Sequence, residues 1–290
     1  MKRFVPVIIK DYIKNLLAKF SRNQFANYYF ENQSEFKTDL PHDIFIKKFL
    51  SVITQSQKVG KQIIGIDVGC NTGDYISILK SICSEPKSEI LCFEPNPVNL
   101  PIIKEKIKPM TAVKLFNCAI SNFSSFANFY NWKAYKSNDE GNQVGGLRAG
   151  GEFLCKVEVK TLSEVLKEEY NLENIIIKFL KIDVEGNDTN VIKGLGENLS
   201  LCEYIVFECS DCLDDHRGPG IKNPMKDIVD YLSLKGFDTY RIGSKKLLRV
   251  NDYYWDYTYE KYKFWSNCFA LKKEDQLIKS IINNNFDYII

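Results

Sequence analysis

Residues 62–75 read QIIGIDVGCNTGDY, and this stretch decides the fold. Residues 62–67 form a short apolar run that ends in an acid, which is typical of a buried strand. Gly69 and Gly73 follow, and glycines permit a tight turn and a close approach of the backbone to a ligand. Helical spacing of apolar residues then begins at Tyr75. A strand, a glycine loop and a helix in this order predict the opening of a βαβ unit.

The same alternation of apolar strands and helices extends along the chain. The predicted main strands are 62–67, 89–94, 113–119, 175–184, 204–209, 237–242 and 267–272, with shorter extended segments at 126–132 and 157–159. The predicted helices are 43–51, 75–82, 98–107, 162–170, 189–195 and 225–235. We therefore expect an α/β fold, with a doubly wound, mostly parallel, seven-stranded Rossmann-like sheet and helices on both faces.

Composition bounds the partners and the compartment. The chain has 290 residues, of which 44% are hydrophobic and 26% charged, as in a globular protein. Lys and Arg number 39 and Asp and Glu number 37, so the net charge of +2 gives no electrostatic basis for nucleic acid as a main partner. Nine scattered cysteines, an odd number, indicate free thiols in a reducing compartment, so we expect a cytoplasmic protein. Cys209, Cys212 and His216 lack a fourth zinc ligand, which favours inert thiols there.

Residues 1–59 are predicted to form a helical extension. Its apolar residues recur at helical spacing at Ile9, Ile13, Leu16, Leu17 and Phe20. The favoured interpretation is a helix that packs on its own domain or on a second subunit of a homo-oligomer. The alternative is weak contact with an anionic membrane surface. We expect neither a signal peptide nor a transmembrane segment, because no run reaches the roughly 18 apolar residues that a spanning helix needs.

Four acids fall near the carboxyl ends of predicted parallel strands: Asp67, Glu94, Asp183 and Glu208. In open α/β sheets, ligands bind in the crevice at that edge. The loop after Asp67 does not have the GxGxxG spacing of a dinucleotide site and contains neither Lys nor Arg. Glu94 follows this loop by roughly 20 residues, where an acid that accepts hydrogen bonds from ribose hydroxyls is expected. The pattern predicts a nucleoside cofactor that needs no phosphate site.

Six blocks of the sequence resemble one family. They are DVGCNTGDY (67–75), CFEPNP (92–97), NCAISN (117–122), LKIDVEGND (180–188), VIKG (191–194) and VFE (206–208). Together they are similar to the FkbM family of S-adenosylmethionine-dependent class I methyltransferases. The resemblance covers about residues 60–272 and implies a methyltransferase that uses S-adenosyl-L-methionine. We expect its domain to comprise residues 60–290. The resemblance also implies transfer to oxygen, frequently a sugar hydroxyl, so the expected partner is a sugar or glycan acceptor.

The resemblance assigns roles in cofactor binding. The methionine part of the cofactor would be held by Asp67, Gly69, Asn71, Gly73 and Asp74. Glu94 would accept hydrogen bonds from both ribose hydroxyls, and Pro95 and Asn96 would shape that wall. Cys118 and Ala119 occupy the place where such enzymes contact adenine. Because a thiol accepts hydrogen bonds poorly, Ser121 or Asn122 would take over the role that many class I enzymes give to an acid.

Catalysis is expected at the end of the fourth main strand. Asp183 would lie beside the transferred methyl group, and a sugar hydroxyl needs a general base or a metal ion to become nucleophilic. The candidate bases are Asp183 and His216. Lys181 and Glu185 would share a face with Asp183 if the strand continues that far, either with a direct role or as a buried ion pair. Asp183 and Glu208 are also candidate ligands for Mg²⁺ or Mn²⁺.

The glycine-rich segment 133–151 is predicted to be a loop that closes over the acceptor, with a surface insertion as the alternative. Two other classes of function remain open from the sequence. A nicotinamide-dependent oxidoreductase would share the sheet and an acid like Glu94, although it should carry GxGxxG. The other alternative is a partner subunit that has this fold and binds the cofactor but catalyses no reaction.

Overall fold

The computed structural model describes residues 31, 45–50, 60–131, 145–147, 151–210, 225–244, 247–256 and 265–276. Residues 45–50 are helical, in agreement with the helix predicted at 43–51. The predicted helix near the N-terminus, Cys212 of the CxxC pair, the loop of His216 and most of the segment 133–151 lie outside the described residues. Within the described ranges, no helix is long and apolar enough to cross a membrane.

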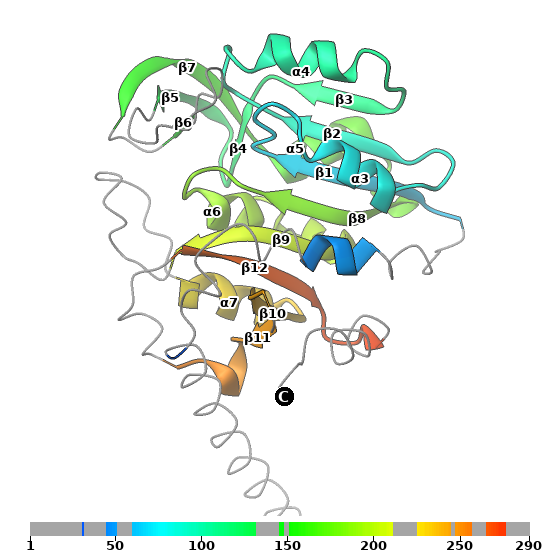
Figure 1. The fold of residues 1–290 in the computed structure, drawn as a ribbon, viewed down its shortest axis with the longest axis vertical. Coiled ribbons are helices and arrows are strands. Elements are labelled where there is room, and N and C mark those ends of the chain that lie inside the picture. The colour runs from blue at the N-terminus through cyan, green and yellow to red at the C-terminus, as the bar shows by residue number, and fades with distance from the viewer. Residues whose placement is uncertain are drawn as a thin grey trace, which may run out of the picture.

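An eight-stranded sheet forms the centre of the molecule, with the order β11-β10-β12-β9-β8-β1-β2-β3 (Figure 1). Its strands are β1 (Gln62–Val68), β2 (Glu89–Phe93), β3 (Val113–Phe116), β8 (Ile175–Ile182), β9 (Cys202–Ser210), β10 (Phe237–Ile242), β11 (Leu247–Arg249) and β12 (Trp265–Lys272). The pairs β1–β2, β2–β3, β1–β8 and β8–β9 are parallel. β12 runs antiparallel between β9 and β10. The expected mostly parallel arrangement of seven strands is therefore confirmed, and the short β11 extends one edge.

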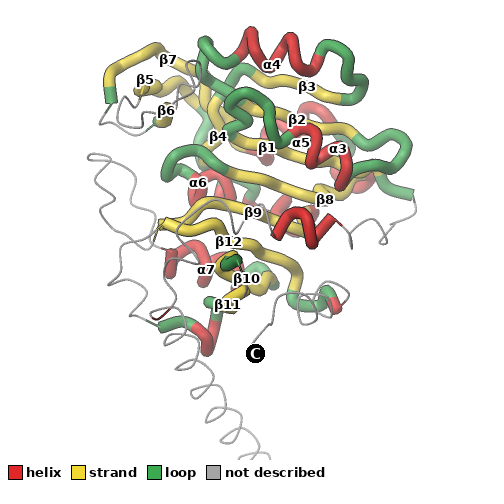
Figure 2. Tube along the Cα trace, viewed as in Figure 1, coloured by secondary structure: helices red, strands yellow, loops and turns green. Residues whose placement is uncertain are grey.

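Helices cover both faces of this sheet (Figure 2). On one face, helix 45–50, α3 (Ile76–Ile82) and α4 (Leu100–Ile107) pack through residues such as Phe49, Leu79 and Ile103. On the other face lie α5 (Leu162–Glu169), α6 (Asp188–Lys193) and α7 (Met225–Leu234). The short 3-10 helices are η2 (Leu172–Asn174), η3 (Gly196–Leu201) and η4 (Asp252–Tyr254). The doubly wound architecture is confirmed.

The central strand β8 shows why the sequence favours this arrangement. All eight of its residues, IIIKFLKI, are buried, because helices cover the sheet on both sides. Lys178 within this run pairs with Glu203 of β9, with 2.9 Å between the ammonium and carboxylate groups. A buried lysine needs such a partner, since an isolated charge in the interior is costly.

A second, four-stranded sheet lies beside the carboxyl edge of the main sheet (Figure 1). Its order is β4-β7-β5-β6, with the bounds β4 (Ala119–Ser121), β5 (Ser125–Asn131), β6 (Gly145–Gly146) and β7 (Glu152–Thr161). The prediction of one strand over 113–119 was wrong, because β3 ends at Phe116 and the chain enters the second sheet at Ala119. The segment predicted at 157–159 is part of the ten-residue β7. Gly145 and Gly146 form a strand rather than a loop.

Helix α6 joins the small sheet to the main sheet. The Asn187 side-chain amide, one residue before this helix, donates to the Ile120 carbonyl at 3.1 Å. At the other end of the helix, a Cβ on Gly194 would lie 2.2 Å from the Ser121 carbonyl oxygen. Both contacts fix β4 against α6, so the small sheet is held at a defined place next to the strand ends.

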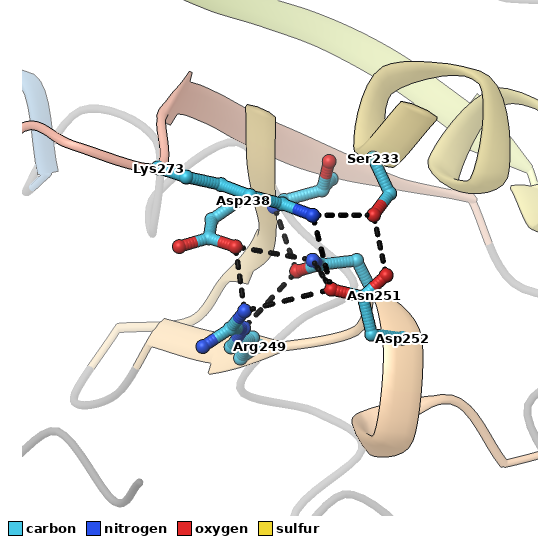
Figure 3. Close-up of polar contacts among 7 residues, drawn as sticks. Ser233, Asp238, Arg249, Asn251, Asp252 and Lys273 are labelled. Carbon is cyan, nitrogen blue, oxygen red and sulfur yellow. Dashed lines mark hydrogen bonds and ion pairs between the residues drawn. The ribbon is translucent and has the colours of Figure 1, made fainter. Parts of the chain in front are cut away.

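A polar network stabilises the edge of the main sheet that is formed by β10 and β11 (Figure 3). The Arg249 guanidinium pairs with Asp238 at 2.6 Å, and the Asn251 side-chain amide donates to the same carboxylate at 3.1 Å. Lys273 donates to Ser233 at 2.9 Å and lies 3.3 Å from Asp252. These bonds link β10, β11, α7 and the end of β12, which explains how a strand as short as β11 stays attached.

Helix α5 provides a test of local stability. The Thr161 hydroxyl accepts a hydrogen bond from the Glu164 backbone N–H at 3.1 Å and caps the helix, as the sequence TLSE predicts. We expect Thr161→Ala to lower the free energy of unfolding by about 1 kcal/mol in denaturant titrations. Thr161→Ser keeps the hydroxyl and is the matched control. Equal stability of Thr161→Ala and the wild type would contradict the role of this cap.

Candidate active site

A cavity opens where the carboxyl ends of β1, β2 and β8 meet the small sheet. It is lined by Val68, Gly69, Asn71, Phe93, Glu94, Pro95, Asn99, Cys118, Ala119, Ile120, Phe129, Gly145, Gly146, Leu147, Asp183, Val184, Glu185 and Asn187. Eight of the site residues predicted from the sequence are in this wall: Gly69, Asn71, Glu94, Pro95, Cys118, Ala119, Asp183 and Glu185. Seven others lie outside it: Asp67, Gly73, Asp74, Asn96, Asn122, Lys181 and Glu208.

The glycine loop is fixed by contacts with both neighbouring strands. The backbone N–H groups of Gly69 and Cys70 donate to the Phe93 carbonyl at 3.0 and 3.1 Å. The Asp183 N–H donates to the Val68 carbonyl at 3.0 Å, which continues the pairing of β1 with β8. Gly69 has φ +77°, and a Cβ there would lie 1.9 Å from the Asp183 carbonyl oxygen. Only glycine fits at this position.

Glu94 lies at the end of β2 with 5% of its surface exposed. Its two carboxylate oxygens accept hydrogen bonds from the backbone N–H groups of Asn71 at 2.8 Å and Asn96 at 2.9 Å. Burial raises the pKa of Glu94 to about 7, although these hydrogen bonds oppose the shift. The carboxylate is therefore held in one orientation, and a change in pH near neutrality alters its charge.

Asn99 is a site residue that the sequence analysis missed. Its side-chain amide donates to the Asn71 side-chain oxygen at 3.0 Å, and it also hydrogen-bonds to the Glu94 side chain. Asn71 itself adopts φ +47°, which asparagine tolerates better than most residues. Asn99 thus couples the glycine loop to Glu94. The only indication of this role in the sequence was the position of Asn99, about one helical turn after Asn96 and at the start of a helix.

The opposite wall is apolar and comes largely from the small sheet. Ala119 and Ile120 of β4, Phe129 of β5 and Leu147 after β6 line it. Cys118 is buried, and burial raises the pKa of its thiol to about 12, so it remains neutral. A flat apolar slot beside Glu94 suits a purine base. The contribution of Phe129 could not be read from the sequence, because it depends on pairing between distant strands.

Glu185 does not continue β8. The strand ends at Ile182, and Glu185 and Gly186 have φ values of +57° and +90°. The strand therefore does not continue far enough for Glu185 to share a face with Lys181 and Asp183, which was the condition of that prediction. The Lys181 ammonium instead lies 3.1 Å from Asp67, with Asp183 at 3.7 Å.

Asp74 lies on the outer side of the glycine loop. It is exposed, it pairs with Lys106 of α4, and it accepts a hydrogen bond from the Thr72 hydroxyl at 2.7 Å. Lys106 and Thr72 lower the pKa of Asp74 through these hydrogen bonds. The Lys106 ammonium also donates to the Thr72 carbonyl at 3.0 Å. Asp74 therefore fastens the loop to α4 and does not enter the cavity wall.

Asp188 is a second residue near the site that the sequence analysis missed, and it interacts electrostatically with Asp183. Asp188 is 1% exposed, and it accepts a hydrogen bond from the Glu208 backbone N–H at 3.2 Å. Burial, with a smaller contribution from the Asp183 charge, raises the pKa of Asp188 to about 7. Across the described ranges, no group of three or more His, Cys, Asp and Glu side chains could hold a metal ion. A metal at Asp183 and Glu208 remains a prediction.

The sheet order and the ligand cavity at the carboxyl ends of β1, β2 and β8 define a class I methyltransferase fold. Residues 67–239 match the model of the Methyltransferase FkbM domain. The chain belongs to this family of methyltransferases.

The chain is similar to two proteins named as methyltransferases and to one solved structure. The 2-O-methyltransferase NoeI of Sinorhizobium fredii is 28% identical over 178 residues, which cover 54% of this chain and 71% of that protein. Methyltransferase sdnD of Sordaria araneosa is 30% identical over 171 residues, which cover 49% of this chain and 64% of the relative. Among solved structures, Methyltransferase FkbM from Methylobacillus flagellatus KT has a TM-score of 0.41 and 12% identity. That alignment covers 90% of this chain and 60% of the other.

The pKa of Glu94 gives a prediction for ligand binding. A carboxylate accepts hydrogen bonds from ribose hydroxyls more strongly than a neutral carboxyl group does. Because the pKa of free Glu94 is about 7, we expect the affinity for S-adenosylhomocysteine to rise about tenfold from pH 6 to pH 8. Isothermal titration calorimetry at the two pH values measures this change.

Glu94→Gln serves as the matched variant for that measurement. It should bind S-adenosylhomocysteine more weakly, by roughly 2 kcal/mol, and should lose most of the pH dependence. A pH dependence of equal size in the variant would assign the titration to another group, such as Asp188.

Proposed function

We propose that the chain is an S-adenosylmethionine-dependent O-methyltransferase that acts on a sugar hydroxyl of a glycan, a glycolipid or a related natural product. The observation that carries the proposal is the cavity itself. Glu94 is fixed beside an apolar slot, and none of the described residues that line the cavity is Lys or Arg. This chemistry suits a nucleoside with a free ribose diol and no phosphate.

Two further facts support the finer points of the proposal. The name of the relative NoeI, a 2-O-methyltransferase, supports oxygen as the acceptor atom. The proposal that the acceptor is a sugar rests on the family resemblance, since the described residues of the cavity wall do not by themselves identify an acceptor. The family match favours methyl transfer over a nicotinamide-dependent oxidoreductase. A partner subunit without catalysis is an outcome that the experiments below distinguish.

S-adenosylmethionine supplies an electrophilic methyl group, and transfer is an in-line displacement in which the C–S bond breaks as the C–O bond forms. The residues of the chain position the reactants and accept the hydroxyl proton. We assign the second task to Asp183, and the proposal is supported by its position in the cavity wall and by the 50% exposure of its side chain. Its backbone is fixed by the bond to Val68, so the carboxylate projects from a rigid strand end.

The first experiment compares ligands. The protein should bind S-adenosylhomocysteine in calorimetric titrations and should show no measurable affinity for NAD. Binding of NAD without S-adenosylhomocysteine would contradict the proposal. A panel of oligosaccharides, glycolipids and small glycosides, incubated with methyl-labelled S-adenosylmethionine, then tests for transfer.

Asp183→Asn tests the general base. We expect a loss of at least ~100-fold in kcat with the affinity for S-adenosylhomocysteine nearly unchanged, because the base acts on the acceptor proton. Asp230→Asn on α7 is the matched control, since Asp230 has a similarly exposed carboxylate, at 49%, and lies outside the cavity. Equal kcat values for Asp183→Asn and the wild type would contradict the role of Asp183. His216 would then be the next candidate.

The predicted metal has its own test. If Asp183 and Glu208 hold Mg²⁺ or Mn²⁺, EDTA should abolish methyl transfer and either ion should restore it. Glu208→Gln should then raise the Mg²⁺ concentration needed for half-maximal activity. Full activity in EDTA would contradict the metal and leave Asp183 to act as a base.

We also propose a cytoplasmic location. Seven of the described cysteines carry thiols and form no disulfide: Cys70, Cys83, Cys92, Cys118, Cys155, Cys202 and Cys268. Free buried thiols are typical of proteins that fold in a reducing compartment.

A further inference from the structure

Asp67 and Lys181 form a buried ion pair directly behind the cavity wall. Asp67, at the end of β1, is 0% exposed, and Lys181, at the end of β8, is 9% exposed. The Lys181 ammonium lies 3.1 Å from Asp67 Oδ1. Neither residue is part of the cavity wall, although Gly69 and Asp183, which follow them along the chain, are.

One ammonium group connects three parts of the site. Besides Asp67, Lys181 donates a hydrogen bond to the Gly69 carbonyl at 3.0 Å and lies 3.7 Å from the Asp183 carboxylate. Its charge also lies 5.8 Å from the centre of the Tyr75 ring. The end of β1, the glycine loop and the end of β8 therefore share a single cation. Because the Lys181 ammonium contacts both Gly69 and Asp183, a change in its position would shift these two residues of the cavity wall.

Asp67 depends on this cation for its charge. Within the described part of the chain, neither Asp67 oxygen accepts a well-aligned hydrogen bond, so the nearby ammonium is what compensates for burial. Burial opposes the charge on Lys181, but the carboxylates of Asp67 and Asp183 outweigh it and raise the pKa of Lys181 above its ordinary value. Lys181 in turn counteracts the burial that raises the pKa of Asp67, and with both groups charged the pair carries no net charge.

A neutral pair at this place has a consequence for the proposed reaction. The methyl donor is a sulfonium cation, and its product S-adenosylhomocysteine is a neutral sulfide at the same atom. Opposite charges behind Gly69 and Asp183 largely cancel at the sulfur. If one of the two charges were missing, the other would attract or repel the sulfonium through a wall that contains little water. An unpaired charge at roughly 8–10 Å in such surroundings changes the affinity for the cationic donor about tenfold or more.

We propose that Lys181 is a positioning residue, and that its pairing with Asp67 sets the relative affinity of the site for the cationic donor and the neutral product. This inference rests on the proposed use of S-adenosylmethionine. It replaces both a direct catalytic role for Lys181 and direct contact of Asp67 with the cofactor. The pair keeps the glycine loop attached to β8 without placing an excess charge beneath the reacting sulfur.

Asp67→Asn tests the proposal, because it removes the nearer carboxylate, at 3.1 Å, and leaves Lys181 only the half-exposed carboxylate of Asp183 at 3.7 Å. Calorimetric affinities for S-adenosylmethionine and S-adenosylhomocysteine are measured in the absence of acceptor. We expect the ratio of the two affinities to shift about tenfold toward S-adenosylhomocysteine. In the double variant Asp67→Asn/Lys181→Met both charges are gone, and the ratio should return to within about twofold of the wild-type value.

The Lys178–Glu203 pair is the matched control. It joins β8 to the neighbouring strand β9, whereas Asp67 and Lys181 join β8 to β1 on its other side. It is as deeply buried, at 2% and 7% exposure, and it lies outside the cavity wall. Glu203→Gln should lower thermal stability without changing the affinity ratio. If Asp67→Asn weakens both ligands equally, or if the double variant keeps the shifted ratio, the pair is only structural and the proposal is overturned.

Two other outcomes have defined meanings. If Asp67→Asn does not fold, Lys181→Gln carries the test with the opposite sign when it is measured at alkaline pH, because the Asp67 carboxyl, whose pKa burial raises, then carries its negative charge. S-adenosylmethionine should then gain relative to S-adenosylhomocysteine, and an unchanged ratio would overturn the proposal. If the wild-type protein binds neither ligand, the proposed function itself fails, and this inference fails with it.

Discussion

The carbonyl of Asp183 lies so close to the backbone of Gly69 that no side chain fits between them, and the site is arranged around this contact. The bond from the Asp183 N–H to the Val68 carbonyl keeps β1 and β8 in register up to their last residues. The chain then turns away in the left-handed region at Gly69 and binds the Phe93 carbonyl of β2. As a result, Glu94 from β2 and Asp183 from β8 face one cavity, although 89 positions separate them in the sequence (183 − 94).

The sequence located the site well, because its location depends on a general property of parallel sheets. The carboxyl ends of parallel strands meet at one edge, so acids at the ends of apolar runs were expected to gather there. The acids nevertheless have different roles. Glu94 and Asp183 reach the cavity, whereas Asp67 points into the interior and pairs with Lys181. Alternate residues of a strand face opposite sides, and which side faces the ligand depends on where the loop leaves the sheet.

The small sheet was the main part of the fold that the sequence could not predict. The apolar run at 113–119 looks continuous, yet the chain changes sheets between Phe116 and Ala119. Pairing of β5 with β6 and β7 joins residues that are distant in the sequence, and a two-residue glycine strand such as β6 has no apolar pattern of its own. Phe129 and Leu147 entered the cavity wall through that pairing. Local capping, by contrast, was predicted correctly at Thr161, because its chemistry lies within four consecutive residues.

The position of β12 between β9 and β10 constrains how the molecule is made. Among the described strands, β10 has no parallel neighbour and reaches the rest of the sheet only through β12, which lies later in the chain. During synthesis, β9 therefore presents an open edge until residues 265–272 have emerged from the ribosome, and α7, β10 and β11 have no sheet to join before then. The half of the sheet that carries Glu94 and Asp183 can form earlier. The half that contains β10 and β11 can join the sheet only after β12 has been synthesised, because β12 lies between β9 and β10.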